Sequence, residues 1–287
     1  MSENTTKKTC VLIGTCITFG VAFMLRSSEE FLNEYDFIKF ETNSDTKIVE
    51  NLGISDELLA RADVIIYHPP GWADWGNEEG YVNLVQRFPE NAEKISIPYP
   101  IFPVLWPFHC HDSRNEQVNG QIFPDGGGIN YPYGDAIVVG ARKKGLDPGE
   151  IVSSCMSVDY AEMIDLQALL NTSMNIQIQK EADTDVKMLD FVQNNFTNRR
   201  GFQTMNHVGN ETLLHMVNQI LARLGLAKLP RTLLDRIDEL VRPQSPIHPS
   251  VIRHFDLRYV DADTRYLVDR YRYLTYEEYL WNYIKFI

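Results

Sequence analysis

The sequence predicts an α/β fold of three layers, in which helices cover both faces of a parallel sheet and further helices follow at the C-terminal end. Three observations predict it. Apolar runs without polar alternation, at residues 11–13 and 64–66, are typical of strands buried on both faces of a parallel sheet. Helical segments alternate with these runs. Proline follows the third and fourth strands, and it ends them because it cannot donate to a central ladder.

The first hundred residues contain the predicted sheet. Four strands are expected, at residues 10–13, 35–40, 63–67 and 94–97. Helices are expected from Cys16 to Phe31 or Leu32, and from Ser55 onward. Gly14 frees the backbone for a tight turn after the first strand. The carboxyl ends of parallel strands share one edge, which is where such sheets bind ligands, so Cys16, His68 and the Pro98 region are expected to meet there.

The rest of the chain is expected to be mostly helical. A long loop rich in proline, glycine and aromatic residues covers 98–133, and a loop of this length in a compact domain is usually functional. Asn210 is the expected N-cap of the helix at 211–224. Within the helical segment 160–195, the charges at 180–185 suggest an exposed or interrupted middle. Helices are predicted at 135–144, 148–155, much of 160–195, 211–224, 230–241 and 265–287, with a short strand at 201–205. We expect one domain over 1–250 and a helical extension over 251–287.

Composition excludes several classes of protein. The 287 residues are 44% hydrophobic and 23% charged, as in ordinary globular proteins, and the net charge of −12 argues against a nucleic-acid partner. Four cysteines without a CxxC pair indicate reduced thiols in the cytoplasm. The apolar run 10–25 is shorter than a membrane span, so no stable insertion is expected, although a signal or anchor stays an alternative.

Cys16 is the first candidate for chemistry. A thiolate is a strong nucleophile, and it forms more readily at a helix N-terminus or beside an imidazolium. Cys16 is expected between the first strand and the first helix, which provides such a terminus. The alternative is a small buried core residue.

The segment 199–207 is the second candidate, because it carries two cations, an amide and an imidazole. His207 can act as a base near neutral pH, and Asn206 can donate to an oxyanion, as can backbone N–H groups near Gly14 and Thr15. His68 is a rival base. Asn206 and His207 can equally be caps of the next helix.

Other polar clusters suggest weaker sites. Arg199 and Arg200 can grip a phosphorylated cofactor, since arginine matches phosphate bidentately. A zinc site at His109 and His111 lacks a second ligand pair at metal spacing, so no metal is expected and these histidines are assigned to the aromatic loop. No Walker loop, dinucleotide fingerprint or serine-hydrolase elbow is present.

These motifs resemble the polysaccharide biosynthesis acetyltransferase family typified by WcbI, whose members look like SGNH hydrolases with cysteine as nucleophile. The likeness covers about 9–249. The family's Gly-Asn-Cys-Gln reads Gly14-Thr15-Cys16-Ile17 here, and its Thr-x-Asn-His-Pro ends Asn206-His207-Val208. The resemblance implies an SGNH- or flavodoxin-like sheet and acetyl transfer from acetyl-coenzyme A to a sugar of a capsular or surface polysaccharide.

The sequence therefore favours an acetyl-coenzyme A-dependent O-acetyltransferase. Cys16, His207, Asn206 and His68 are its expected catalytic residues. Gly14, Thr15, Arg199 and Arg200 are the expected coenzyme-binding residues. An SGNH-like esterase or thioesterase and a non-catalytic glycan- or nucleotide-binding protein remain alternatives. Asp112 and Asp135 are both open as a residue orienting the histidine. The aromatic C-terminal helix is a candidate contact in a homo-oligomer.

Overall fold

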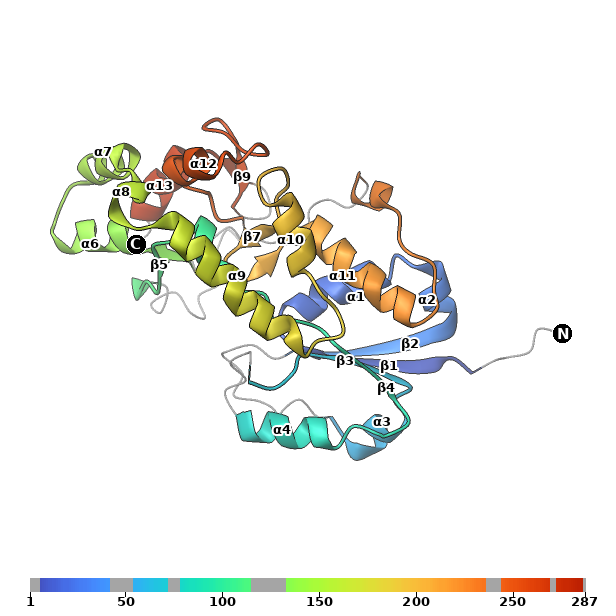
Figure 1. The fold of residues 1–287 in the computed structure, drawn as a ribbon. Coiled ribbons are helices and arrows are strands. Elements are labelled where there is room, and N and C mark those ends of the chain that lie inside the picture. The colour runs from blue at the N-terminus through green and yellow to red at the C-terminus, as the bar shows by residue number, and fades with distance from the viewer. Residues whose placement is uncertain are drawn as a thin grey trace. The chain divides into compact units, whose positions relative to one another are not determined.

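The structure is a computed structural model that describes residues 6–41, 54–71, 78–114, 133–235, 244–268 and 272–285 (Figure 1). The chain divides into two compact units, and each is described by itself. Unit 1 comprises Met1–Pro100, Met174–Asn194 and His207–Leu240. Unit 2 comprises Ile101–Ser173, Asn195–Asn206 and Val241–Ile287. The domain boundary expected at residue 250 stays a prediction.

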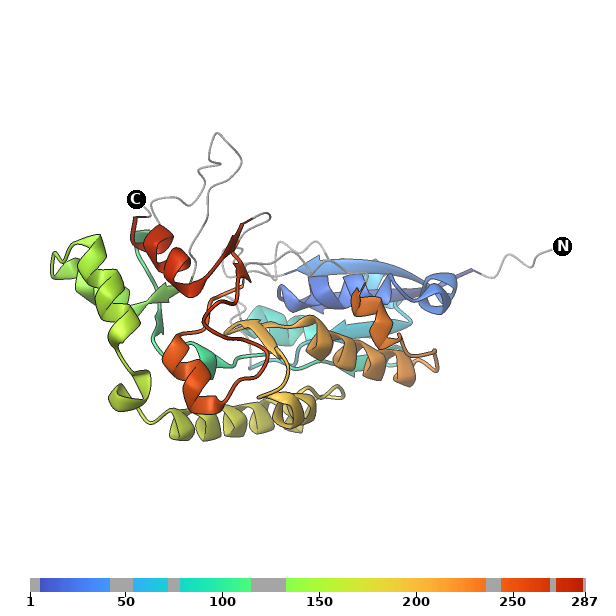
Figure 2. The same ribbon diagram turned by 90° about the horizontal axis from the view of Figure 1, so that it is seen from above.

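Unit 1 is built on a four-stranded parallel sheet, which confirms the predicted fold class. Its strands are β1 (Lys8–Gly14), β2 (Tyr35–Glu41), β3 (Val64–Tyr67) and β4 (Glu93–Ser96). They lie in the order β2-β1-β3-β4 (Figure 2). The chain leaves β1 toward β2 and later returns to the other side of β1 for β3. This reversal is the topological switch point at which open α/β sheets bind ligands beyond the carboxyl ends of their strands.

Helices cover both faces of this sheet. In Figure 1, α1 (Ile17–Leu25) and α11 (Asn210–Arg223) lie on one face, with α3 (Asp56–Ala60) and α4 (Glu78–Gln86) on the other. Apolar residues of β1 and β3 pack against the second pair, because every other residue of a strand points to the same face. This part of the core consists of Val11, Ile13, Leu59, Ala62, Ile65, Tyr81, Leu84, Phe88 and Ala92.

The first predicted helix is wrong in one respect, because it ends early. A second helix, α2 (Glu29–Glu34), begins after Ser28, whose backbone is extended and whose hydroxyl accepts a hydrogen bond from the Phe31 amide at 3.2 Å. This N-cap separates the two helices. The four strands and the short helix after Ser55 follow the prediction to within one or two residues.

Unit 2 contains short helices and strands of two or three residues. Its elements are η1 (Pro103–Leu105), β5 (His109–Cys110), β6 (Gly134–Asp135), α6 (Ala136–Lys143), α7 (Pro148–Ser157), α8 (Tyr160–Met163), β7 (Phe202–Thr204), α12 (Pro249–Phe255), β9 (Tyr266–Leu267), β10 (Tyr273–Leu274) and α13 (Tyr276–Lys285). The division between the units falls within α9 (Leu166–Ala182) and α10 (Leu189–Asn195). Unit 1 also contains β8 (His207–Val208) and η2 (Arg231–Asp235).

Several predicted helices differ from the observed ones. The segment 160–195 is interrupted, as suggested, but Lys180 and Glu181 are buried rather than exposed. Gly209, not Asn210, is the N-cap of α11. The C-terminal aromatic segment forms the β9 and β10 pair before α13, so it is not one continuous helix.

Two expectations fall partly or wholly outside the described residues. Of the helix expected at 230–241, the described part is the short η2. Most of the predicted aromatic loop, at 115–132, lies outside the described residues. Within the described part of the chain, no helix has the length and apolar character needed to cross a membrane.

Candidate active site

Cys16 lies at the carboxyl edge of the unit 1 sheet, beside the switch point. Strand β1 ends at Gly14, and Cys16 is the N-cap of α1. The first turn closes when the amide of Thr18 donates to the Thr15 carbonyl at 2.9 Å and that of Phe19 to the Cys16 carbonyl at 3.2 Å. The thiol is thus held between a buried strand and a helix N-terminus, and it is partly exposed.

His207 contacts this thiol from a distant part of the sequence. Its Nε2 lies 3.0 Å from Cys16 Sγ, although the two residues are 191 positions apart. Gly209, the N-cap of α11, is two residues after His207, so the helix that packs beside α1 in unit 1 also fixes the histidine. A thiol in contact with an imidazole can pass its proton to the ring and become a nucleophile.

His68 occupies a different environment from His207. It is fully buried after β3, and its Nδ1–H donates to the Ile97 carbonyl at 3.0 Å because a carbonyl can only accept. Nε2 is then the acceptor, at 3.3 Å from the Thr15 hydroxyl. Burial lowers the pKa of His68 to about 4, so the ring is neutral near pH 7. Its described contacts make His68 a support for Thr15.

Gly14 allows this close approach. Ile13 and Tyr67 are register partners, so the next residues, Gly14 and His68, also lie side by side. A Cβ at position 14 would lie 2.8 Å from His68 Cδ2 and 2.4 Å from Thr18 Cγ2. Only glycine leaves room for the imidazole at this point.

Lys180 is a nearby residue that the sequence analysis did not assign to the site. Its side chain is 5% exposed, with Nζ 5.0 Å from the centre of the Tyr99 ring, and Tyr99 in turn packs edge-on against His68. Burial lowers the pKa of Lys180 to about 8, and its charge further lowers the pKa of His68. In the sequence, Lys180 belongs to the charged run 180–185, which is typical of an exposed segment, so its burial could not be predicted.

Asn206 belongs to unit 2, where two hydroxyls fix its amide. Tyr133 and Thr204 both donate to Asn206 Oδ1, each at 3.0 Å. Two donors on one oxygen assign the amide orientation, leaving Nδ2 as the donor. Among the described residues, none accepts a hydrogen bond from Nδ2. Tyr133 was not predicted to act here, because its partner is 73 residues away.

The two arginines predicted to bind phosphate also lie in unit 2. The Arg199 amide donates to the carbonyl of Asn195, the last residue of α10, at 2.9 Å. This arginine therefore lies in the turn that follows the helix. The Arg200 guanidinium lies 5.2 Å from the centre of the Tyr266 ring, a cation–π distance. Their predicted role toward a coenzyme stays a prediction.

Asp112 and Asp135 have structural partners in unit 2. Asp112 forms an ion pair with Arg114 and accepts from Tyr283 Oη at 2.7 Å, which holds its pKa at about 2. Asp135 caps α6 and accepts from Tyr160 Oη at 3.1 Å. None of the four cysteines forms a disulfide bond. The described residues contain no group of three or more His, Cys, Asp or Glu side chains arranged to hold a metal.

Fold and site together define an α/β protein with a cysteine and a histidine in contact at the edge of a parallel sheet. The family model for the polysaccharide biosynthesis enzyme WcbI matches residues 9–229. The chain therefore belongs to the WcbI family of polysaccharide biosynthesis enzymes, which confirms the resemblance found in the sequence.

A solved structure of WcbI, a polysaccharide biosynthesis enzyme, is similar to this chain with a TM-score of 0.71 and 18% identity. The match covers 98% of this chain and 90% of that one. That structure is described as the native protein without a disulfide bond between coenzyme A and one of its cysteines. At this identity the similarity shows a shared fold. No curated protein matches the sequence.

Proposed function

We propose that the protein is a coenzyme A-dependent O-acetyltransferase that modifies a sugar of a capsular or surface polysaccharide in the cytoplasm. The observation that carries this proposal is the 3.0 Å contact between Cys16 Sγ and His207 Nε2. Family membership supports a role in polysaccharide biosynthesis. The description of the similar WcbI structure, which mentions coenzyme A and a cysteine, supports a thioester donor.

In the first step, His207 takes the proton of Cys16 and the thiolate attacks the carbonyl carbon of acetyl-coenzyme A. A new bond forms between Cys16 Sγ and the acetyl carbon. The bond from that carbon to the coenzyme sulfur breaks, and the leaving coenzyme thiolate accepts from His207 the proton that came from Cys16. The products are an acetyl-cysteine and free coenzyme A.

In the second step, His207 removes the proton of a sugar hydroxyl as its oxygen attacks the acetyl-cysteine. The carbon–sulfur bond breaks, and Cys16 recovers a proton from His207. Asn206 Nδ2 and the backbone N–H groups after Gly14 are the proposed donors to the oxyanion of each tetrahedral intermediate. Arg199 and Arg200 are the proposed partners of the coenzyme phosphates.

His68 and Thr15 support this chemistry in the proposal without exchanging protons. The family's asparagine before the cysteine is Thr15 here, and its hydroxyl contacts His68 Nε2. A neutral imidazole with a fixed tautomer holds the turn that precedes Cys16. We therefore assign the base to His207 and a positioning role to His68.

The test is to mix the protein with acetyl-coenzyme A in the absence of sugar and measure its intact mass and the thiol released. We expect one acetyl group on Cys16 and one equivalent of free coenzyme A. Cys16→Ser and His207→Ala should both suppress the adduct. Cys110→Ser, which changes another partly exposed thiol, should leave it unchanged.

Two results would contradict the proposal. Thiol release that is unaffected by both Cys16→Ser and His207→Ala would remove the proposed mechanism. Rapid loss of the acetyl group to water, with no transfer to any carbohydrate acceptor, would identify a thioesterase instead. A third result would change the mechanism alone. If the unsubstituted protein forms no adduct and releases no thiol without sugar, yet acetylates sugar when it is added, the acetyl group is transferred directly and His207 activates the sugar hydroxyl.

A further inference from the structure

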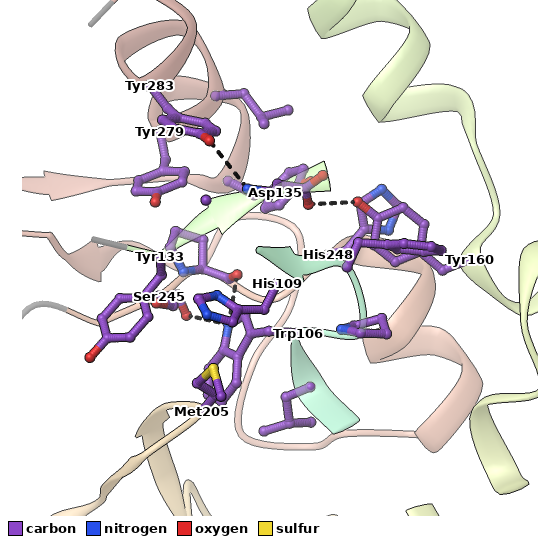
Figure 3. Close-up of a pocket in the computed structure, with 17 residues that line it drawn as sticks. Trp106, His109, Tyr133, Asp135, Tyr160, Met205, Ser245, His248, Tyr279 and Tyr283 are labelled. Atoms are coloured by element: carbon purple, nitrogen blue, oxygen red, sulfur yellow. Dashed lines mark hydrogen bonds between the residues drawn. The ribbon is translucent and has the colours of Figure 1, made fainter. Parts of the chain in front are cut away.

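Unit 2 contains a cavity with aromatic walls to which the proposed function has so far assigned no ligand (Figure 3). It opens among η1, the start of α6, the segment around Ser245 and α13. Rings of several types line it, together with one thioether. The lining side chains that matter below are Trp106, His109, Tyr133, Met205, Tyr279 and Tyr283.

Hydrogen bonds hold the walls of this cavity in place. Trp106 Nε1 donates to the carbonyls of Ser245 and Pro246, both at 3.1 Å, so the edge of the indole is anchored. On the other side, Tyr160 stacks on His248 (Figure 3), and their ring centroids are 3.8 Å apart. Tyr160 also donates to Asp135. A preformed aromatic cavity loses little conformational entropy when a ligand binds.

The cavity lacks the charge that a phosphate would need. Among the described residues that line it, none is lysine or arginine. The Asp135 carboxylate is engaged by the amides of Ile137 and Val138 and by Tyr160. His248 is held in its neutral form, because Nε2 donates to the Cys155 carbonyl at 2.8 Å and Nδ1 accepts from Ser250. These features favour an uncharged ligand.

His109 supplies the polar group that such a ligand would contact. Its ring is half-buried beside Tyr133, with centroids 5.5 Å apart, and no described residue forms a hydrogen bond with its ring nitrogens. Burial lowers its pKa, so the ring is neutral and offers one donor and one acceptor. A hydroxyl group has the same two capacities. One hydroxyl can therefore pair with either nitrogen.

We propose that this cavity is a carbohydrate-binding site that takes one pyranose ring, with His109 bound to a ring hydroxyl. A pyranose has apolar C–H faces for the aromatic walls and hydroxyls at its edge. The family to which the chain belongs is one of polysaccharide biosynthesis enzymes, and polysaccharides are built of sugars. That the bound sugar is the acetyl acceptor rests on the proposed function.

The binding can be measured on the full chain by saturation-transfer NMR. The probes are the methyl pyranosides of glucose, galactose, mannose and their 6-deoxy forms, with adenosine as a nucleobase probe. We expect at least one pyranoside to bind. His109→Phe, which keeps an aromatic ring but removes both nitrogens, should weaken it about five- to tenfold. His254→Phe, an exposed histidine in the same unit that does not line this cavity, is the matched control.

A second variant guards against misfolding. If His109→Phe fails to fold, His109→Gln takes its place in the test. Glutamine keeps a donor and an acceptor, so this variant should retain most of the affinity for the pyranoside. The inference is overturned if no pyranoside binds the folded protein, or if His109→Phe binds sugar as well as the unsubstituted chain does. Adenosine binding that depends on His109, without pyranoside binding, would also overturn it and identify a nucleobase site.

Cys16→Ser separates this inference from the proposed function. Sugar binding should persist in Cys16→Ser, because Cys16 is in unit 1 and the cavity lining is in unit 2. Sugar binding in a protein that never transfers acetyl groups would leave the inference standing and refute the proposed function. Acetyl transfer that depends on Cys16, in a protein that binds no pyranoside, would leave the proposed function standing and overturn this inference.

Discussion

The two units use histidine in the same two ways. In unit 1, His68 has a carbonyl on one nitrogen and a hydroxyl on the other, and His207 contacts the Cys16 thiol. In unit 2, His248 is held between the Cys155 carbonyl and Ser250, and His109 lines the cavity. The two buried rings adopt opposite tautomers, with the proton on Nδ1 in His68 and on Nε2 in His248.

The difference between the units lies in what the second histidine faces. His207 contacts a thiol beside a helix N-terminus, so unit 1 offers a nucleophile and a base. His109 lines a cavity of aromatic side chains, so unit 2 offers a binding surface. A histidine with both nitrogens engaged by backbone and hydroxyl groups acts as a support. The partner atoms, rather than the residue type, separate the roles.

The largest expected effect is on chemistry in unit 1. Cys16→Ser should lower acetyl transfer by at least about a thousandfold, because the hydroxyl of serine is a far weaker nucleophile than a thiolate at neutral pH. Steady-state kinetics with acetyl-coenzyme A measures it, with Cys110→Ser as the control. If activity survives while sugar binding is lost, the assignment of chemistry to unit 1 and recognition to unit 2 is reversed.

The next effect concerns the support role of His68. Its pKa is about 4 in the folded state against 6.5 for the free side chain, so the unfolded chain binds the extra proton first. The stabilisation from neutral His68 is complete above about pH 6.5 and is lost as the pH falls to about 4. It amounts to about 3 kcal/mol.

Urea unfolding between pH 7 and 4 measures this dependence. His68→Asn should flatten much of the slope, and the part due to burial of His109 and His248, whose pKa values are also lowered, should remain. His254→Asn, at an exposed position, is the control variant. An unchanged slope in His68→Asn would mean that His68 is not the buried neutral support described above.

A smaller effect is expected from the glycine that admits His68. Gly14→Ala introduces a methyl group 2.4 Å from Thr18 Cγ2 and 2.8 Å from His68 Cδ2, so it should destabilise the protein by roughly 1–3 kcal/mol and lower activity. Gly140→Ala is the control, since no atom lies within 4 Å of its added Cβ, in the middle of α6. It should be neutral or slightly stabilising. Equal stability of the two variants would exclude steric crowding at Gly14.

The smallest effect tests whether unit 2 also assists the chemistry. Tyr133→Phe removes one of the two donors to Asn206 Oδ1 and should lower kcat about tenfold through a less well-oriented amide. Tyr273→Phe, at an exposed ring, should have no effect. A change in the sugar KM alone would restrict Tyr133 to binding and would sharpen the division between the units.

The parallel sheet could be predicted because its signal is local. Strands β1 and β3 are continuous apolar runs, and a proline soon after β3 and β4 marks each strand end, so burial and chain breaks are both visible in the sequence. The meeting of Cys16 and His68 at one edge follows from parallel topology. The choice between His207 and His68 as the partner of Cys16 was left open, because spacing along the chain does not show which residue 191 or 52 positions away meets the thiol.

The remaining features depend on tertiary contacts that leave no local pattern. Lys180 has the sequence context of a surface lysine, yet it is buried against Tyr99. Gly209 replaces Asn210 as the N-cap because α11 begins at Asn210 itself. The aromatic C-terminal segment was expected to be one helix, but β9 and β10 precede α13. Tertiary contacts override helical pattern at such places.

Two thiols, one within strand β1 and one just beyond its end, differ in accessibility. Cys10 is completely buried in the strand that pairs with both β2 and β3, and Cys16, six residues later, is partly exposed. An alkylating reagent should therefore modify Cys16 in the native protein and Cys10 only when the centre of unit 1 opens. The rate at which Cys10 is alkylated, measured with Cys16 replaced by serine, therefore reports how often the sheet of unit 1 opens.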